Sequence, residues 1–191
     1  VALLGVLLAH SLRYIEIDPL HRFDAFLYDS RVRLFARGAI DERIVIVDID
    51  ERSLVELGRW PWNRARLAAL IEQIFERYGA LLLGLDVILA EADESSGLPA
   101  LEALGRGPLR QHTAFQAALA ELRPELDYDG RLAKVLHRYP VILGFHLSHG
   151  EAAARSGALP LPLLPEVAAQ AGQFSQWNGY GANLPRLQQA A

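Results

Sequence analysis

A strand–helix–strand pattern over residues 43–91 constrains the fold of this chain more than any other part of its sequence. The pattern opens with IVIV at 44–47, a β-branched apolar run typical of a strand buried on both faces of a parallel sheet. A second apolar run, LLLGL at 81–85, has the same character. Two strands joined through a helix form a βαβ unit with a right-handed crossover. We therefore predict that the two runs are parallel neighbours in one sheet.

The segment between the two runs has the periodicity of an amphipathic helix over 64–78, with apolar residues at three- and four-residue steps. Asn63 precedes this helix and can accept hydrogen bonds from the free N–H groups of its first turn. Gly79 follows it and can adopt the left-handed conformation that ends many helices. We expect the helix to pack on the sheet.

A third buried strand is predicted over VILGF at 141–145, so the fold class is α/β, with a mostly parallel sheet, βαβ units and flanking helices. Further helices are predicted over 20–36, 53–57, 98–104, 112–122 and 130–138, with another beginning near Pro185. Asp129 is the predicted N-cap of the 130–138 helix, and Pro124 is predicted to stop the helix before it. The glycine-rich segment at 177–181 is predicted to be a turn.

Carboxylates follow the ends of the predicted strands, at Asp48, Asp50, Asp86 and Glu91. Ligands bind at the carboxyl edge of open parallel sheets, so these four side chains are candidate ligand-binding residues. Hard oxygen ligands suit Ca²⁺ or Mg²⁺, but aspartates at strand ends also commonly cap neighbouring backbone. A cation site at this edge is therefore one alternative beside simple capping, and no other cofactor is expected.

The block GRWPWNR at 58–64 is a stiff aromatic corner with two interpretations. Arg59, Trp60, Trp62 and Arg64 can form a ligand platform, because a guanidinium group can stack on an indole ring. Alternatively, the corner is structural and fixes the direction in which the helix leaves the sheet. We favour the structural interpretation and predict that Trp60 or Trp62 is largely buried, and we keep all four residues as ligand-binding candidates.

Composition excludes several classes of function. The net charge of −4 argues against a basic face that binds nucleic acid, and the absence of cysteine excludes disulfides and thiolate chemistry. The sequence contains no serine nucleophile elbow, P-loop or dinucleotide-binding glycine motif, so no catalytic residue is assigned. Since it contains no methionine, we expect it to be a fragment or a processed piece.

Residues 1–9, VALLGVLLA, are apolar but too few to span a bilayer, which takes about 20 helical residues. The run can be the outer end of a transmembrane helix, or a buried segment at the edge of a domain. A signal-peptide core is a third interpretation, although no small-residue cleavage site follows it.

Several segments together resemble the second class of the CHASE family, the cyclases/histidine kinases associated sensory extracellular domains. The similar segments are IVIVDIDERSLVELGRWPWNRARLAALI at 44–71, GALLLGLDVILAE at 79–91 and FDAFLYDSRVRLF at 23–35, with a weaker likeness in NLPRLQQAA at 183–191. The GRWPWNR block is the most specific match. The resemblance covers most of the chain, but the sequence ends before the Gly-Phe-rich stretch and the Asp-Gly…Arg motif with which the family normally continues.

The resemblance implies an extracytoplasmic sensory domain of a bacterial membrane-bound signalling receptor. Residues 1–12 would be the outer end of a transmembrane helix in the cytoplasmic membrane, and residues 13–191 a sensor domain, incomplete at its C-terminus, on the periplasmic or extracellular side. The full-length protein would carry an adenylate or guanylate cyclase, histidine kinase, diguanylate cyclase or Ser/Thr kinase as its output module. We expect a homodimer, with the 20–36 helix near the contact, and a small molecule or ion as ligand.

The alternative is a soluble α/β protein that binds a small molecule, or a hydrolase. Asp48 and Asp50 after a predicted strand resemble the aspartyl nucleophile motif of haloacid-dehalogenase-like phosphatases. Arg52 occupies the place where that family has Thr or Ser, and Ser53 lies one position too late. We therefore expect that this chain is not itself an enzyme.

Overall fold

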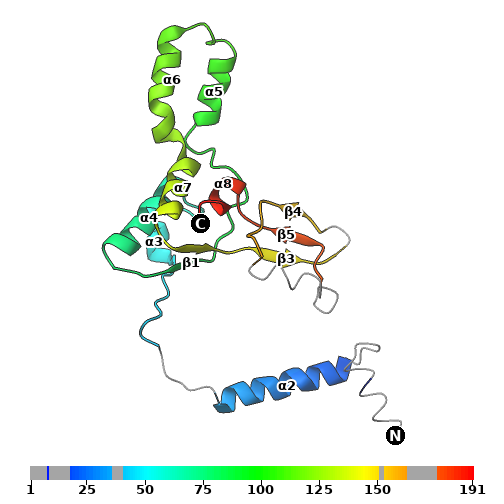
Figure 1. Cartoon of the computed structure of the whole chain (residues 1–191). Coiled ribbons are helices and arrows are strands. Elements are labelled where there is room, and N and C mark those ends of the chain that lie inside the picture. Colours follow the sequence, from blue (N-terminus) through cyan, green and yellow to red (C-terminus); the bar gives the residue numbers. More distant parts are fainter. Residues whose placement is uncertain (1–7, 9–17, 36–40, 151–152, 163–175) are drawn as a thin grey trace. The chain divides into compact units, whose positions relative to one another are not determined.

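The computed structural model describes residues 8, 18–35, 41–150, 153–162 and 176–191 of the chain (Figure 1). It combines helices with small sheets, as expected of the α/β class. The chain divides into two units, Val1–Ile49 and Asp50–Ala191. The predicted end of a transmembrane helix over residues 1–12 lies outside the described residues, apart from Leu8. Within the described residues, no helix is both long and apolar enough to cross a membrane.

The N-terminal unit contains helix α2 (Asp18–Phe35), which confirms the helix predicted over 20–36. The run at 44–47, in contrast, forms no strand, and its four side chains are exposed. The prediction of a buried strand there was wrong. A β-branched apolar run favours extended backbone, but a strand also needs a hydrogen-bonding partner, and a run of one residue class does not specify which edge it pairs with.

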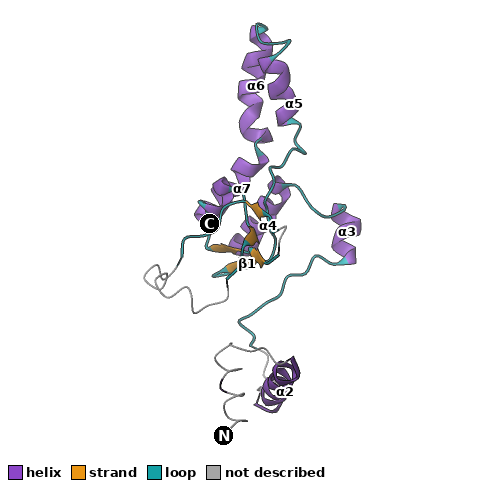
Figure 2. Ribbon diagram, turned by 90° about the vertical axis from the view of Figure 1, so that its right-hand side faces the viewer, coloured by secondary structure: helices purple, strands orange, loops and turns teal. Residues whose placement is uncertain are grey.

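Two packed helices, α4 (Arg64–Glu76) and α7 (Tyr128–Arg138), form the centre of the second unit (Figures 1 and 2). The predicted Asn63 cap of α4 is confirmed, because its side-chain oxygen accepts a hydrogen bond from the Arg66 N–H at 2.8 Å. Apolar side chains of both helices are buried. These are Leu67, Ala68, Ile71, Leu132, Ala133, Val135 and Leu136. This burial is the main stabilisation of the unit.

Strands β1 (Leu83–Leu85) and β2 (Val141–Leu143) form a parallel pair, with Leu83 opposite Val141. This pairing confirms that the second and third predicted runs are parallel neighbours, although both strands are shorter than predicted. In the described residues the sheet has two strands and not three. Val141 and Leu143 are buried while Ile142 is exposed, so one face of the pair is directed into the core.

A second, three-stranded sheet has the order β3 (His146–Ser148), β5 (Gly179–Gly181), β4 (Arg155–Ser156). The β5 strand runs antiparallel to β3 and parallel to β4. The prediction of a turn over 177–181 was therefore wrong for its last three residues. Glycine suits this central strand because a Cβ atom at Gly179 would meet the Ala154 carbonyl oxygen at 2.8 Å.

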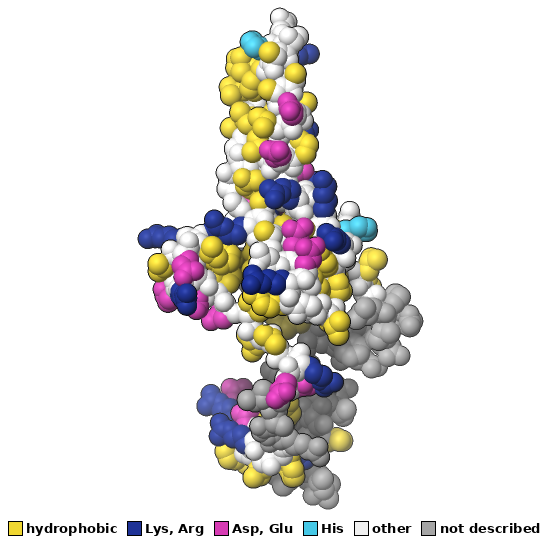
Figure 3. Space-filling model, turned by 90° about the vertical axis from the view of Figure 1, so that its left-hand side faces the viewer, with side chains coloured by type: hydrophobic (Ala, Val, Ile, Leu, Met, Phe, Trp, Pro, Cys, Tyr) yellow, Lys and Arg dark blue, Asp and Glu magenta, His cyan; other side chains and the backbone are white. Residues whose placement is uncertain are grey.

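The remaining helices are α3 (Glu51–Leu57), α5 (Leu98–Arg106), α6 (Thr113–Leu126) and α8 (Pro185–Gln188), each close to a predicted helix. Helices α5 and α6 lie side by side as a hairpin (Figures 1 and 2). Figure 3 shows apolar side chains on the surface of this hairpin, and Leu104 and Leu122 are both exposed.

Two predicted helix boundaries near this hairpin were wrong. Helix α6 continues through Pro124, since a proline near the C-terminal end removes only one intrahelical hydrogen bond. The N-cap of α7 is Asp127, not Asp129, because the Asp127 side chain accepts from the Gly130 N–H at 2.8 Å. As a result, the Asp129 side chain is free to make contacts elsewhere.

One buried amide side chain, Asn183, connects three segments of the second unit. Its Oδ1 accepts from the Leu89 N–H at 2.8 Å, and its Nδ2 donates to the Gly144 carbonyl oxygen at 2.9 Å. The neighbouring Leu184 N–H donates to the Leu89 carbonyl oxygen at 2.8 Å. Asn183 itself is fully buried. Together these bonds fix the backbone of the segment that follows β1.

We expect the substitution Asn183→Ala to lower the free energy of unfolding by about 2–4 kcal/mol, because it leaves a buried N–H and a carbonyl without partners. Urea denaturation measures this change. The matched control is Asn178→Ala, since exposed Asn178 makes the same kind of paired bonds with the Gly150 N–H and carbonyl oxygen. There we expect a loss below about 1 kcal/mol, because water replaces the lost partner. Equal losses in the two variants would contradict the role of Asn183.

Candidate functional site

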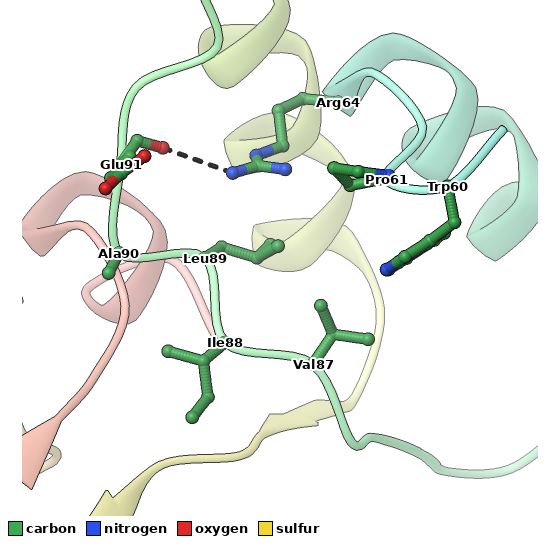
Figure 4. Close-up of a pocket in the computed structure, with 8 residues that line it drawn as sticks. All are labelled: Trp60, Pro61, Arg64, Val87, Ile88, Leu89, Ala90 and Glu91. Carbon is green, nitrogen blue, oxygen red and sulfur yellow. Dashed lines mark hydrogen bonds between the residues drawn. The ribbon is translucent and has the colours of Figure 1, made fainter.

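A pocket of about 320 Å³ opens in the second unit, between the aromatic corner and the segment that follows β1 (Figure 4). Its size falls at the small end of the range for small-molecule sites. One side of the pocket comes from the corner that leads into the first residue of α4, and the other from the segment after β1. The lining residues are Trp60, Pro61, Arg64, Val87, Ile88, Leu89, Ala90 and Glu91.

The two tryptophans of the corner have different roles. Trp62 is only 5% exposed, and its indole N–H donates to the Gly58 carbonyl oxygen at 2.9 Å, which fixes the corner. Trp60 packs edge-on against it, with the ring centroids 5.7 Å apart, and is 36% exposed at the pocket. The prediction that one of the two rings is buried is confirmed. The structural interpretation describes Trp62, and Trp60 remains available to a ligand.

The opposite wall is an apolar segment with a fixed backbone. Leu89 is buried, and both its N–H and its carbonyl oxygen are hydrogen-bonded, to Asn183 and Leu184. Figure 4 shows the side chains of Val87 and Leu89 directed toward Trp60 and Arg64. The wall therefore presents apolar surface whose position depends on the C-terminal part of the chain.

Arg64, the first residue of α4, supplies the basic group of the pocket. Its side chain is 12% exposed, and its Nη2 donates to the Glu91 carbonyl oxygen at 3.1 Å (Figure 4). Its Nε lies 3.6 Å from Asp129 Oδ1, which is an ion pair but too long for a hydrogen bond. In the described part of the chain, neither of these two buried atoms has a hydrogen-bond partner.

Asp93 holds the backbone beside Arg64. Its Oδ2 accepts from the Arg64 N–H at 2.6 Å, and its own N–H donates to Asp129 Oδ2 at 3.0 Å. Burial raises the pKa of Asp93. Hydrogen bonds from Ser95 and from the Arg64 backbone, together with the positive charge of Arg64, lower it by more, so the pKa of Asp93 lies below its usual value. The ionised carboxylate is thus the form that this loop stabilises.

This depressed pKa predicts that the fold loses stability in acid. A carboxyl group whose pKa is lower in the folded than in the unfolded chain stabilises the fold above its unfolded pKa, about 3.9, and loses that contribution as the pH falls through the folded value. We expect the melting temperature to fall more steeply below about pH 4 for the parent than for Asp93→Asn. Parallel melting curves for the two proteins across this range would exclude the effect.

The other predicted site residues do not line the pocket. Asp50 is the N-cap of α3, because its Oδ1 accepts from the Ser53 N–H at 2.8 Å and from the Ser53 hydroxyl at 2.6 Å, and these bonds lower its pKa. Asp86 and Arg59 are exposed outside the pocket lining. Asp48 is an exposed residue of the N-terminal unit. Among the residues that the structure describes, no group of three or more acidic or histidine side chains could hold a metal ion.

Sequence reasoning missed several residues of the site. Residues 87–90 have no feature beyond their apolar character, and Asp129 was assigned to a helix cap that Asp127 makes instead. The cation over an indole ring is Arg66, with its Cζ 6.0 Å from the Trp62 ring centroid, and not Arg59 or Arg64 as predicted. Of these, only Arg66 had a usable signal, because it lies one helical turn from Trp62 in the chain.

Comparison with known proteins agrees with the resemblance in the sequence. The family model described as the CHASE2 domain matches residues 1–178, which is most of the chain. No curated protein and no solved structure matches. Domains of this family are extracellular sensory domains of membrane receptors, and they are not catalytic. The match gives no support to the hydrolase alternative.

Proposed function

The chain belongs to the CHASE2 family, and from this membership we propose that it is the ligand-input domain of a bacterial membrane-bound receptor whose ligand binds in the pocket beside Trp60. The assignment of the ligand to this pocket rests on one observation. Trp60, Arg64 and Glu91, all predicted ligand residues, come from two separate segments and line the same small cavity. A cavity of this size suits a small organic molecule better than a peptide or a protein.

In the proposed receptor, residues 1–12 are the outer end of a transmembrane helix and residues 13–191 form the sensor on the periplasmic or extracellular side. The apolar run at 1–9 and the family membership support this arrangement. The output module in the cytoplasm is a nucleotide cyclase, a histidine kinase, a diguanylate cyclase or a Ser/Thr kinase. Binding in the pocket controls this module.

The receptor is proposed to act as a homodimer with α2 near the contact. Support comes from the apolar side chains that α2 exposes within its own unit, because exposed apolar patches mark interaction surfaces. These side chains are Phe23, Phe26, Leu27, Tyr28, Val32, Leu34 and Phe35. A ligand changes the packing of such a dimer only if it binds one arrangement more tightly than the other.

Cross-linking of the intact receptor in membranes tests this function. Single cysteines are placed along residues 22–35 of a chain that has no native cysteine, and a panel of small metabolites is added. We expect disulfide cross-links whose pattern changes with one metabolite class. The variant Val87→Trp, which fills the pocket, should abolish the change, and Leu122→Trp on exposed α6 should retain it. A receptor that never cross-links along α2 would contradict the dimer, and an unaltered response of Val87→Trp would contradict the pocket.

A further inference from the structure

The residues that line the pocket include one of each charge sign. Arg64 and Glu91 both line it, and the Arg64 Nη2 donates to the Glu91 backbone carbonyl oxygen. Glu91 is exposed, and within the described residues its carboxylate takes part in no ion pair or hydrogen bond. A ligand in this pocket can therefore meet one cationic and one anionic residue.

Arg64 is positioned to donate hydrogen bonds to a ligand oxygen. Its guanidinium is held by the Glu91 carbonyl on one side, and Asp129 balances its charge at 3.6 Å without a hydrogen bond. Nη1 has no hydrogen-bond partner among the described residues, and Figure 4 shows the guanidinium extending toward Pro61. Guanidinium N–H groups bind carboxylate oxygens strongly because the geometry of the two groups matches.

The charge balance argues against a simple acid or a simple amine. Asp129 already offsets the charge of Arg64, so Glu91 leaves the pocket acidic overall, and a ligand that is only a carboxylate meets repulsion. A ligand that is only an amine leaves the buried Arg64 donors unpaired, which is costly. A molecule with both groups on neighbouring atoms satisfies Arg64 and Glu91 together.

The rest of the lining is apolar and small. Val87 and Leu89 face the Trp60 ring across the pocket, so a ligand with an apolar side chain buries that side chain between them (Figure 4). The volume of about 320 Å³ accommodates one such side chain with its polar head.

From this arrangement we propose that the pocket binds a free amino acid with an apolar side chain. Its carboxylate accepts hydrogen bonds from Arg64, and its ammonium group pairs with Glu91. The apolar side chain lies between Trp60, Val87 and Leu89. This inference rests on the proposed function, in which the same pocket receives the ligand, and adds the chemical class of that ligand.

Isothermal titration calorimetry of the intact receptor tests the proposal with three matched probes: L-leucine, 4-methylpentanoate, which lacks the ammonium group, and 3-methylbutylamine, which lacks the carboxylate. We expect leucine to bind at least about tenfold more tightly than either analogue. Glu91→Gln should weaken leucine binding by about tenfold or more and leave binding of 4-methylpentanoate unchanged or stronger. Glu91 is exposed, so this variant keeps the fold, and Glu94→Gln in the exposed loop is the matched control.

Three results would overturn the proposal: no binding of leucine, equal binding of leucine and 4-methylpentanoate, or unchanged leucine affinity in Glu91→Gln. After either of the first two results, the pocket can still be the site for another class of small molecule. In that case Val87→Trp must abolish the binding or the response seen with that class. Leucine binding that persists in Val87→Trp would overturn both the ligand class and the proposed site.

Discussion

Replacing Trp62 with alanine should lower the free energy of unfolding by about 3–5 kcal/mol, the range for truncating a buried aromatic side chain. The ring is 5% exposed, contacts Trp60 edge-on and lies beneath the Arg66 guanidinium. Its indole N–H also donates a hydrogen bond to the Gly58 carbonyl oxygen. Urea denaturation followed by circular dichroism measures the loss.

Trp177→Ala is the matched control for this prediction, because Trp177 is 52% exposed. Removal of an exposed ring should change the free energy of unfolding by less than about 1 kcal/mol. If both substitutions cost the same small amount, Trp62 is not a core residue and the aromatic corner is not what positions α4. A large loss at Trp62 alone supports a rigid corner that presents Trp60 to the pocket.

Replacing Gly157 with alanine should also destabilise the chain strongly, by about 2–5 kcal/mol. Two costs add here: a left-handed backbone conformation, at φ +75°, worth about 1–2 kcal/mol, and a steric clash worth about 1–3 kcal/mol. A Cβ atom at this position would overlap the Ala182 carbonyl group and lie 2.6 Å from the Asn183 carbonyl oxygen. Both contacts are with backbone, which cannot rotate away as a side chain can.

The control is Gly79→Ala, at φ +67°, where a Cβ atom would meet nothing within 4 Å. This variant has the conformational cost without the clash, so we expect a loss of only about 1–2 kcal/mol. Thermal and urea unfolding of the two variants separate the conformational cost from the cost of the steric clash. Similar losses of unfolding free energy at both glycines would show that the close contact of Gly157 with the Ala182–Asn183 backbone is unimportant. The packing of that backbone behind Leu89 would then be unimportant as well.

The elements that the sequence predicted well are those whose signal is local. Helix α4 has a regular apolar period and an asparagine cap, and both appear in the structure. The runs at 81–85 and 141–145 became the parallel pair β1 and β2. The run at 44–47 has as strong a β-branched signal, but composition does not identify the edge with which a strand pairs, and no strand forms there.

The site was predictable only in part, for a related reason. Because ligands bind at the carboxyl ends of parallel strands, the sequence indicated four carboxylates as site residues. One of them, Asp50, instead caps the nearest helix. Arg64 became important through Asp93 and Asp129, which lie far along the chain and contact it only in the folded unit. Residues 87–90 look like ordinary core residues, and they line the pocket because the bonds of Leu89 to Asn183 and Leu184 hold them there.

The central claim is that the sensory ligand binds between the aromatic corner and the segment after β1. Hydrogen–deuterium exchange of the intact receptor, with and without the metabolite that alters its cross-linking, tests the location directly. We predict that the ligand slows exchange in residues 60–66 and 87–91, and that Val87→Trp abolishes this protection. Protection confined to other parts of the chain, or protection of equal size in Val87→Trp, would contradict the claim.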